Sequence, residues 1–150
     1  MKRSLLVSIP PVHFFVALAM EAVAWWLVPQ AQLLYLPVTL FGLVLVVLGW
    51  LLIMASFFQL RGHSTTVTYS TSISLVEKGV YGVSRNPMYV GAAILLFGTA
   101  WLFGNVVSFL GPVFFFLVIH FMFIPFEEAK AEREFGEQYR VYKQKVRRWL

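Results

Sequence analysis

Long apolar runs separated by polar segments dominate the chain. Each run approaches the length of about 20 apolar residues that an α-helix needs to cross a bilayer. We therefore expect an all-α integral membrane protein with four transmembrane helices, at residues 12–28, 36–58, 87–103 and 106–126. The first run ends at Trp25 and Trp26, which are aromatic residues typical of a membrane interface. Gly42 and Gly49 in the second run are candidate points of close helix packing.

Two longer polar segments lie outside these runs, a loop at 59–86 and a tail at 127–150. We find no internal repeat and no linker, so residues 1–150 are read as a single domain. Apolar residues recur in the tail every three or four positions, which predicts one amphipathic helix. This helix either lies on the membrane surface or docks onto the protein's own loop, and Gly136 is a candidate break in it. Its apolar stripe consists of Phe135, Tyr139, Tyr142, Val146 and Trp149.

The charge distribution predicts the topology. Charged residues make up only 13% of the chain, whereas soluble domains contain about 25%. All twelve Lys and Arg residues precede the first run, lie in the 59–86 loop or follow the fourth run. By the positive-inside rule both termini and that loop face the cytoplasm. The net charge of +5 is therefore a topological signal, and we expect no nucleic-acid partner.

Few residue types are available for chemistry. The chain has no cysteine, which excludes disulfides, thiolate catalysis and Cys-ligated metal. The histidines, His13, His63 and His120, lack ligand-like spacing, so no metal is expected. Glu21 lies within the first run, where carboxylates are costly and often functional. We favour a structural role for Glu21, with His120 either its partner or a packed core histidine; a small proton-coupled transporter using both is the alternative.

The stretch 79–91 is the first candidate site, because there the polar loop runs into the third apolar helix. Pro87 suits the first helical position, and Asn86 before it is a good N-cap. With Arg85 at the membrane edge, this stretch presents a helix N-terminus that favours anions. A capped loop-to-helix junction with a snorkelling arginine is the equally weighted structural alternative.

A pair of adjacent glutamates completes the candidate site. Glu127 and Glu128 follow the fourth run. The short turn at Gly104 and Asn105 makes the last two spans an antiparallel hairpin, so the end of the fourth run returns to the start of the third. We therefore expect a pocket for a charged small molecule, in which the acidic pair meets Arg85, Asn86 and Tyr89. The alternative is that the two carboxylates are solvated charges that end the span.

These residues resemble a known family. The chain is similar to the isoprenylcysteine carboxyl methyltransferases and the related membrane phospholipid N-methyltransferases over its C-terminal half. The resemblance rests on Gly79-x-Tyr81, Ser84-Arg85-Asn86-Pro87-Met88-Tyr89-x-Gly91, Glu127-Glu128 and Phe135-Gly136-x-x-Tyr139-x-x-Tyr142. The isoprenylcysteine enzymes usually have His where this chain has Asn86, and Asn-Pro is common in prokaryote-like members.

The resemblance implies a cofactor and its site. S-adenosylmethionine would bind between the last two spans and the C-terminal segment, open to the cytoplasm. Arg85, Glu127 and Glu128 would be catalytic. The cofactor-binding residues would be Tyr81, Arg85, Asn86, Pro87, Tyr89, Gly91, Glu127, Glu128 and Tyr139.

We therefore expect a methyltransferase of a prokaryotic inner membrane, with membrane lipids around it and a lipophilic acceptor. The acceptor is an isoprenylcysteine-type carboxylate, a phospholipid amine or a small thiol. A carboxylate acceptor favours a second cation, for which Arg133 is the candidate, and an amine acceptor needs a base such as Glu127 or Glu128. The alternative is a non-catalytic membrane scaffold with a lipid-binding basic tail.

Overall fold

The computed structural model describes residues 9–62 and 75–150, and over these ranges it contains helices and no strand. Lys2, Arg3 and the hydroxyl-rich stretch 64–74 of the predicted loop lie outside the described residues. The α-helices are α1 (Pro10–Leu27), α2 (Phe41–Gly62), α3 (Pro87–Phe103), α4 (Leu110–Val118), α5 (Ile124–Phe135) and α6 (Glu137–Lys145). The short helical turns are η2 (Pro29–Ala31), η3 (Val38–Leu40), η4 (Gly79–Gly82), η5 (Val106–Phe109) and η6 (Ile119–Phe123). The all-α expectation is confirmed.

The helices have the lengths and surfaces of a multi-pass membrane protein. Within the described residues, three segments are long and apolar enough to cross a membrane: Pro10–Leu27, Val38–Arg61 and Val106–Phe135. The fourth predicted span, Pro87–Phe103, is also an apolar helix but has 17 residues. Large apolar side chains on α2 such as Trp50 are about half exposed (53%), which a lipid environment tolerates and water does not.

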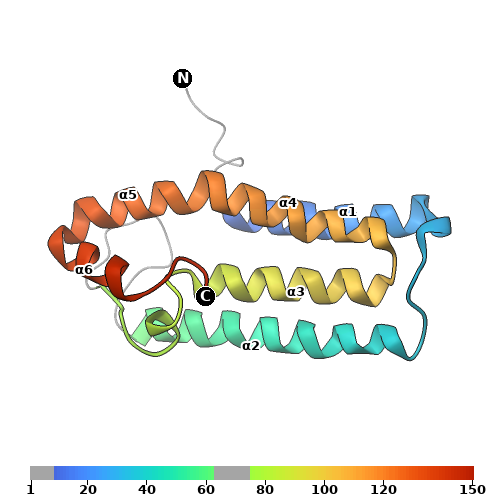
Figure 1. The fold of residues 1–150 in the computed structure, drawn as a ribbon, viewed down its shortest axis with the longest axis horizontal. Coiled ribbons are helices and arrows are strands. Elements are labelled where there is room, and N and C mark those ends of the chain that lie inside the picture. The colour runs from blue at the N-terminus through green and yellow to red at the C-terminus, as the bar shows by residue number, and fades with distance from the viewer. Residues whose placement is uncertain (1–8, 63–74) are drawn as a thin grey trace, which may run out of the picture.

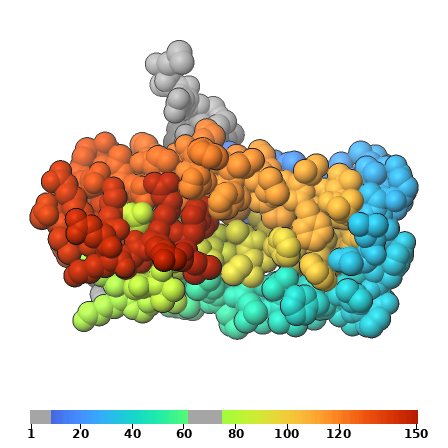
Figure 2. Space-filling model, viewed as in Figure 1, coloured from blue at the N-terminus to red at the C-terminus, as the bar shows by residue number. Residues whose placement is uncertain are grey.

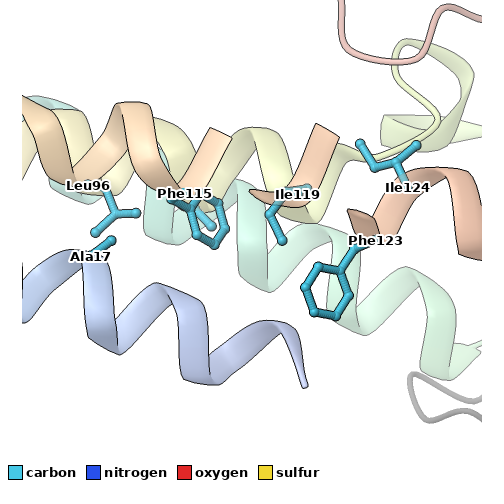
Figure 3. Packing of buried hydrophobic residues seen from close by; sticks show 7 residues of the cluster. Ala17, Leu96, Phe115, Ile119, Phe123 and Ile124 are labelled. Atoms are coloured by element: carbon cyan, nitrogen blue, oxygen red, sulfur yellow. The ribbon is translucent and has the colours of Figure 1, made fainter. Parts of the chain in front are cut away.

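Helix α3 lies at the centre of the bundle. Figure 1 shows α1 and α4 side by side above it and α2 below it. The central core joins α1, α3 and the α4–α5 rod, and Figure 3 shows its side chains meeting between these helices. Its fully buried members include Ala17, Leu96, Phe115, Ile119 and Ile124.

Glycines allow α2 and α3 to touch along their backbones. A Cβ on Gly42 would lie 2.5 Å from the Gly98 carbonyl oxygen, and one on Gly49 would lie 2.6 Å from that of Gly91. A larger residue at any of these positions would force the helices apart, and such close approach gives helices extensive van der Waals contact within a bilayer. The predicted packing role of Gly42 and Gly49 is confirmed.

The fourth span does not stop where the apolar run stops. Helix α4 continues through the π-turn η6 into α5, so one rod carries the chain from Leu110 to Phe135 (Figure 1). Pro125 has no N–H to donate to the preceding turn, and the wider π-turn lies just before it. The rod therefore projects Glu127 and Glu128 beyond the start of α3 from a rigid helix.

The prediction of one amphipathic helix in the tail is wrong in part. The chain breaks at Gly136, as expected, with a φ of 53°, and α6 ends at Lys145. Val146 and Trp149 therefore lie beyond the helix, on residues 146–150, which we call the C-terminal strap. Tyr142 is buried (3% exposed), and its stripe packs against α5 and the loop. The stripe thus docks onto the protein itself.

Candidate functional site

A cavity of about 160 Å³ lies where the end of α2, the start of α3, α5 and α6 meet. Many of the side chains that line it are apolar or aromatic, including Leu60, Val76 and Phe135. Apolar walls with a few convergent polar groups are typical of small-molecule sites. The polar residues predicted from the sequence that line it are Tyr81, Arg85, Asn86, Glu127, Glu128 and Tyr139.

The other predicted site residues lie beside the cavity rather than on its surface. Pro87 is buried at the first turn of α3, where its missing N–H costs nothing. Tyr89 donates from its hydroxyl to Glu127 Oε1 at 2.7 Å, so it reaches the site through that carboxylate. Gly91 faces α2, and a Cβ there would lie 2.8 Å from the Gly49 carbonyl oxygen.

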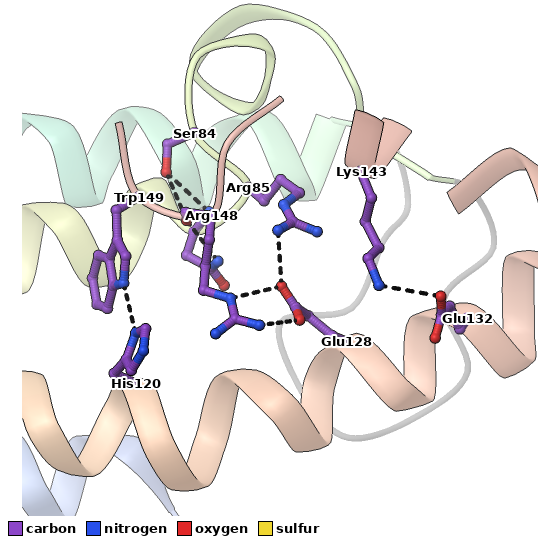
Figure 4. Close-up of polar contacts among 9 residues, drawn as sticks. Ser84, Arg85, His120, Glu128, Glu132, Lys143, Arg148 and Trp149 are labelled. Atoms are coloured by element: carbon purple, nitrogen blue, oxygen red, sulfur yellow. Dashed lines mark hydrogen bonds and ion pairs between the residues drawn. The ribbon is translucent and has the colours of Figure 1, made fainter. Parts of the chain in front are cut away.

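Glu128 is held by two guanidinium groups, as Figure 4 shows. Arg85 Nη2 lies 3.2 Å from Glu128 Oε1. Arg148 donates from Nε to Oε1 at 3.1 Å and from Nη2 to Oε2 at 2.7 Å, which is the two-point geometry that arginine forms with a carboxylate. The Glu128 side chain is 11% exposed, so these charge-assisted bonds are largely shielded from water.

Arg85 has donors to spare. Its side chain is 10% exposed, and its Nε and Nη1 are buried with no hydrogen-bond partner among the described residues. A buried donor without a partner costs about 1–3 kcal/mol, and more when it is charged. Both groups belong to a residue that lines the cavity, so an acceptor bound there would remove this cost.

Asn86 occupies the N-cap position of α3, as predicted, but its side chain makes no capping hydrogen bond. Its Nδ2 donates to the Arg148 carbonyl oxygen at 2.8 Å, and its backbone N–H donates to Ser84 Oγ at 3.1 Å. The amide is therefore engaged by the C-terminal strap, which sequence patterns near Asn86 could not indicate. Asn86 thereby ties the start of α3 to the end of the chain.

The loop before α3 is fixed from two sides. Gln59 on α2 donates to the Lys78 carbonyl and accepts from the Val80 N–H. The Tyr142 hydroxyl on α6 donates to the Tyr81 carbonyl oxygen at 2.7 Å. These bonds fix η4, which leads into the segment that carries Arg85, against α2 and α6.

The tyrosines around the cavity are kept neutral. Burial raises the pKa of Tyr139 to about 12, the nearby Glu128 charge adds to this, and Arg85 opposes it. Burial also raises the pKa of Tyr81 and of Tyr142 above the usual range of a phenol. All three therefore remain protonated hydroxyls near neutral pH, able to donate to a ligand or to the backbone.

The second cation of the site is not the one that we expected. Arg133 does not line the cavity, whereas Arg148 in the C-terminal strap pairs with Glu128. A carboxylate that is buried at a membrane edge needs a cationic partner. This need is the only feature of the sequence that points to the contact between Arg148 and Glu128. The choice among the tail's arginines depends on the fold-back of the strap.

Glu21 and His120 lie away from the cavity and do not pair. Glu21 is fully buried and accepts from the Thr99 hydroxyl at 2.6 Å. His120 Nδ1 accepts from the Trp149 indole N–H at 3.0 Å, and its ring stacks on Phe116. The polar contacts of these two residues are therefore internal, in keeping with the structural role that we favoured.

Comparisons with known proteins find a matching family and several similar proteins. The model of a family described as phospholipid methyltransferase matches residues 38–138. An uncharacterized protein of Haemophilus influenzae is 54% identical over 57 residues, which are 38% of this chain and 89% of that protein. No solved structure gives a significant match.

The other relatives include named enzymes. Protein-S-isoprenylcysteine O-methyltransferase A of Arabidopsis thaliana is 34% identical over 113 residues, which are 71% of this chain and 55% of the plant protein. Protein-S-isoprenylcysteine O-methyltransferase of Schizosaccharomyces pombe is 43% identical over 75 residues, which are 48% of this chain and 30% of the yeast protein. The matches thus span about half, or less, of these enzymes.

Proposed function

Because the chain belongs to the phospholipid methyltransferase family, we propose that it transfers a methyl group from S-adenosylmethionine to a lipophilic acceptor in the membrane. The observation that carries this proposal is Arg85, a buried cation on the wall of an aromatic cavity, whose Nε and Nη1 have no partner among the described residues. Such donors suit the carboxylate of an amino-acid cofactor. The named methyltransferases among the relatives support the same reaction class.

The residues present fit S-adenosylmethionine. When bound, this cofactor supplies a methyl group activated by a positively charged sulfur. Glu127 and Glu128 offer negative charge that favours a sulfonium, or acceptors for ribose hydroxyls. The tyrosines and Phe135 offer aromatic surface for a purine. Pockets for such ligands measure about 300–1,000 Å³, whereas this cavity measures about 160 Å³, so the cofactor would occupy it only in part and extend beyond it.

The protein's contribution to methyl transfer is alignment. An in-line displacement depends on holding donor and acceptor in the right geometry more than on acid–base chemistry. Here each carboxylate is already oriented, Glu127 by Tyr89 and Glu128 by Arg85 and Arg148. Charges that are already oriented stabilise the transition state without the cost of reorganisation, and this saving is the main source of electrostatic catalysis.

The proposed topology has four spans, with both termini and the site on the cytoplasmic side of a prokaryotic inner membrane. The 17 residues of α3 are at the lower limit of about 17 for a spanning helix. The connections opposite the site, residues 28–37 and 104–105, carry no Lys or Arg, as the positive-inside rule requires of outer loops. A lipid acceptor would then reach the site from within the bilayer.

The acceptor proposed is an isoprenylcysteine-type carboxylate or a phospholipid amine. The two classes need different help from the protein. A carboxylate needs a cation to hold it, which Arg85 or Arg148 can provide, whereas an amine must lose a proton, for which Glu127 or Glu128 is the base at hand. The products also differ, since a methyl ester releases methanol in base and an N-methyl group does not.

The test is transfer of labelled methyl from S-adenosylmethionine by the protein in lipid nanodiscs, with a prenylated cysteine or phosphatidylethanolamine as acceptor. We expect labelled lipid from the wild type and from the α5 surface variant Glu134→Gln, and little from Glu128→Gln. Base-labile label identifies the carboxylate acceptor, and stable label identifies the amine. A folded wild type that labels neither class contradicts the proposal and favours the scaffold alternative.

A further inference from the structure

The C-terminal strap is bonded to the segment before α3, to α5 and to the π-turn η6, without lining the cavity. The Arg147 carbonyl accepts from the Arg85 backbone N–H at 2.9 Å, which makes a short parallel bridge to the segment before α3. Trp149 donates from its indole N–H to His120 at the π-turn η6, as Figure 4 shows. In Figure 2 the C-terminal residues, in red, pack over loop residues in lime. The strap is therefore a fixed part of the site's support.

Arg148 is the strap residue whose side chain enters the site's charge network. It takes both Glu128 oxygens, whereas Arg85 makes only one contact with that carboxylate. A lone Arg85 beside Glu128 would be expected to adopt the same two-point pairing, because that is the preferred geometry of the pair. It would then use Nη2 together with Nε or Nη1, and so take up one of the two nitrogens that have no partner among the described residues.

We propose that Arg148 is a positioning residue for the cofactor site. By occupying both oxygens of Glu128 from outside the cavity, it keeps the carboxylate turned away from two-point pairing with Arg85. The Nε and Nη1 groups of Arg85 thereby stay available to a ligand. The inference rests on the proposed cofactor binding, but assigns a role to a residue that neither lines the cavity nor touches the reacting atoms.

The proposed role requires an arginine, and it requires that arginine at position 148. A lysine offers a point charge rather than a planar fork, so it cannot hold both oxygens in the same geometry. The neighbouring Arg147 carries the same charge, but it is exposed and contributes its backbone carbonyl to the site. Arg147→Ala therefore removes one positive charge from the strap while leaving the partners of Glu128 in place.

The experiment is calorimetric titration of S-adenosylhomocysteine into the full-length wild type, Arg147→Ala, Arg148→Ala and Arg148→Lys in lipid nanodiscs. We expect Arg148→Ala to bind at least about tenfold more weakly, the factor that corresponds to about 1.4 kcal/mol. Arg147→Ala should bind within about twofold of wild type, as surface substitutions usually do. Added methylguanidine should restore much of the affinity of Arg148→Ala, because Arg148 is a third exposed and its place is open to solvent.

Wild-type affinity in Arg148→Ala, or an equal loss in Arg147→Ala, overturns the inference. So does failure of methylguanidine to restore binding in a folded Arg148→Ala protein, since the loss would then be structural. Where Arg148→Ala does not fold, Arg148→Lys decides: weaker binding supports the role of the fork, and wild-type affinity refutes it. No binding by the folded wild type would instead refute the proposed function.

Discussion

The buried pair between Arg85 and Glu128 should dominate the stability of the cavity region. Each side chain is only about a tenth exposed (10% and 11%), so water screens their attraction weakly. Glu128→Gln leaves the Arg85 guanidinium buried without its counter-charge. Breaking such a pair from one side costs about 3–5 kcal/mol. Glutamine still offers one acceptor oxygen, so we expect the lower part of that range.

A double-mutant cycle isolates the pair. Arg85→Met, Glu128→Gln and the double variant are unfolded reversibly in mixed detergent micelles, and the free energies of unfolding are compared. We expect the double variant to be more stable than the sum of the single changes predicts, with a coupling of about 0.5–3 kcal/mol. The control is Glu137 with Arg140 on α6, a pair 77% and 65% exposed, for which coupling should be about 0.2–0.5 kcal/mol. Coupling at the buried pair no larger than in this control would refute the reasoning.

Two further predictions concern packing and pH. Gly49→Ala should lower the free energy of unfolding by about 1–3 kcal/mol, because its Cβ would lie 2.6 Å from the Gly91 carbonyl oxygen; the neighbouring lipid-facing change Leu48→Ala should have a much smaller effect in the same assay. Tyr139 has its pKa raised from 10.0 to about 12, so the folded state holds the phenolic proton more tightly than the unfolded state. Stability should therefore fall as pH rises from about 10 through about 12, and Tyr139→Phe should flatten that part of the measured stability curve; an unchanged slope contradicts the prediction.

Local signals in the sequence are sufficient to predict that the main site residues lie close together. The apolar runs have helical lengths, and the turn at Gly104 and Asn105 is too short for anything but an antiparallel hairpin. That hairpin alone returns Glu127 and Glu128 to the level of Arg85, and all three line the cavity. The close packing at the glycines of α2 could also be predicted, because small residues in membrane helices typically lie where two helices touch.

The contacts of the C-terminal strap could not be predicted in the same way. The three-and-four spacing continues through Val146 and Trp149, yet the helix ends at Lys145. The isolated backbone bridge between Ser84 and Arg147 joins residues that are far apart in the sequence, and it leaves no periodic signal in either segment. Because of the same long-range contact, the Asn86 side chain donates to the Arg148 carbonyl instead of capping α3, and the Arg148 side chain reaches Glu128.

The central claim is that S-adenosylmethionine binds in the cavity at the start of α3. The most direct test is ultraviolet cross-linking of the labelled cofactor to the membrane-embedded protein, with and without excess S-adenosylhomocysteine, followed by peptide mapping. We expect label that the competitor removes, in peptides covering residues 75–86 or 127–142, which contribute most of the cavity wall. Competitor-sensitive label confined to α1 or to the connection at 28–37, or none in a folded protein, would contradict the account.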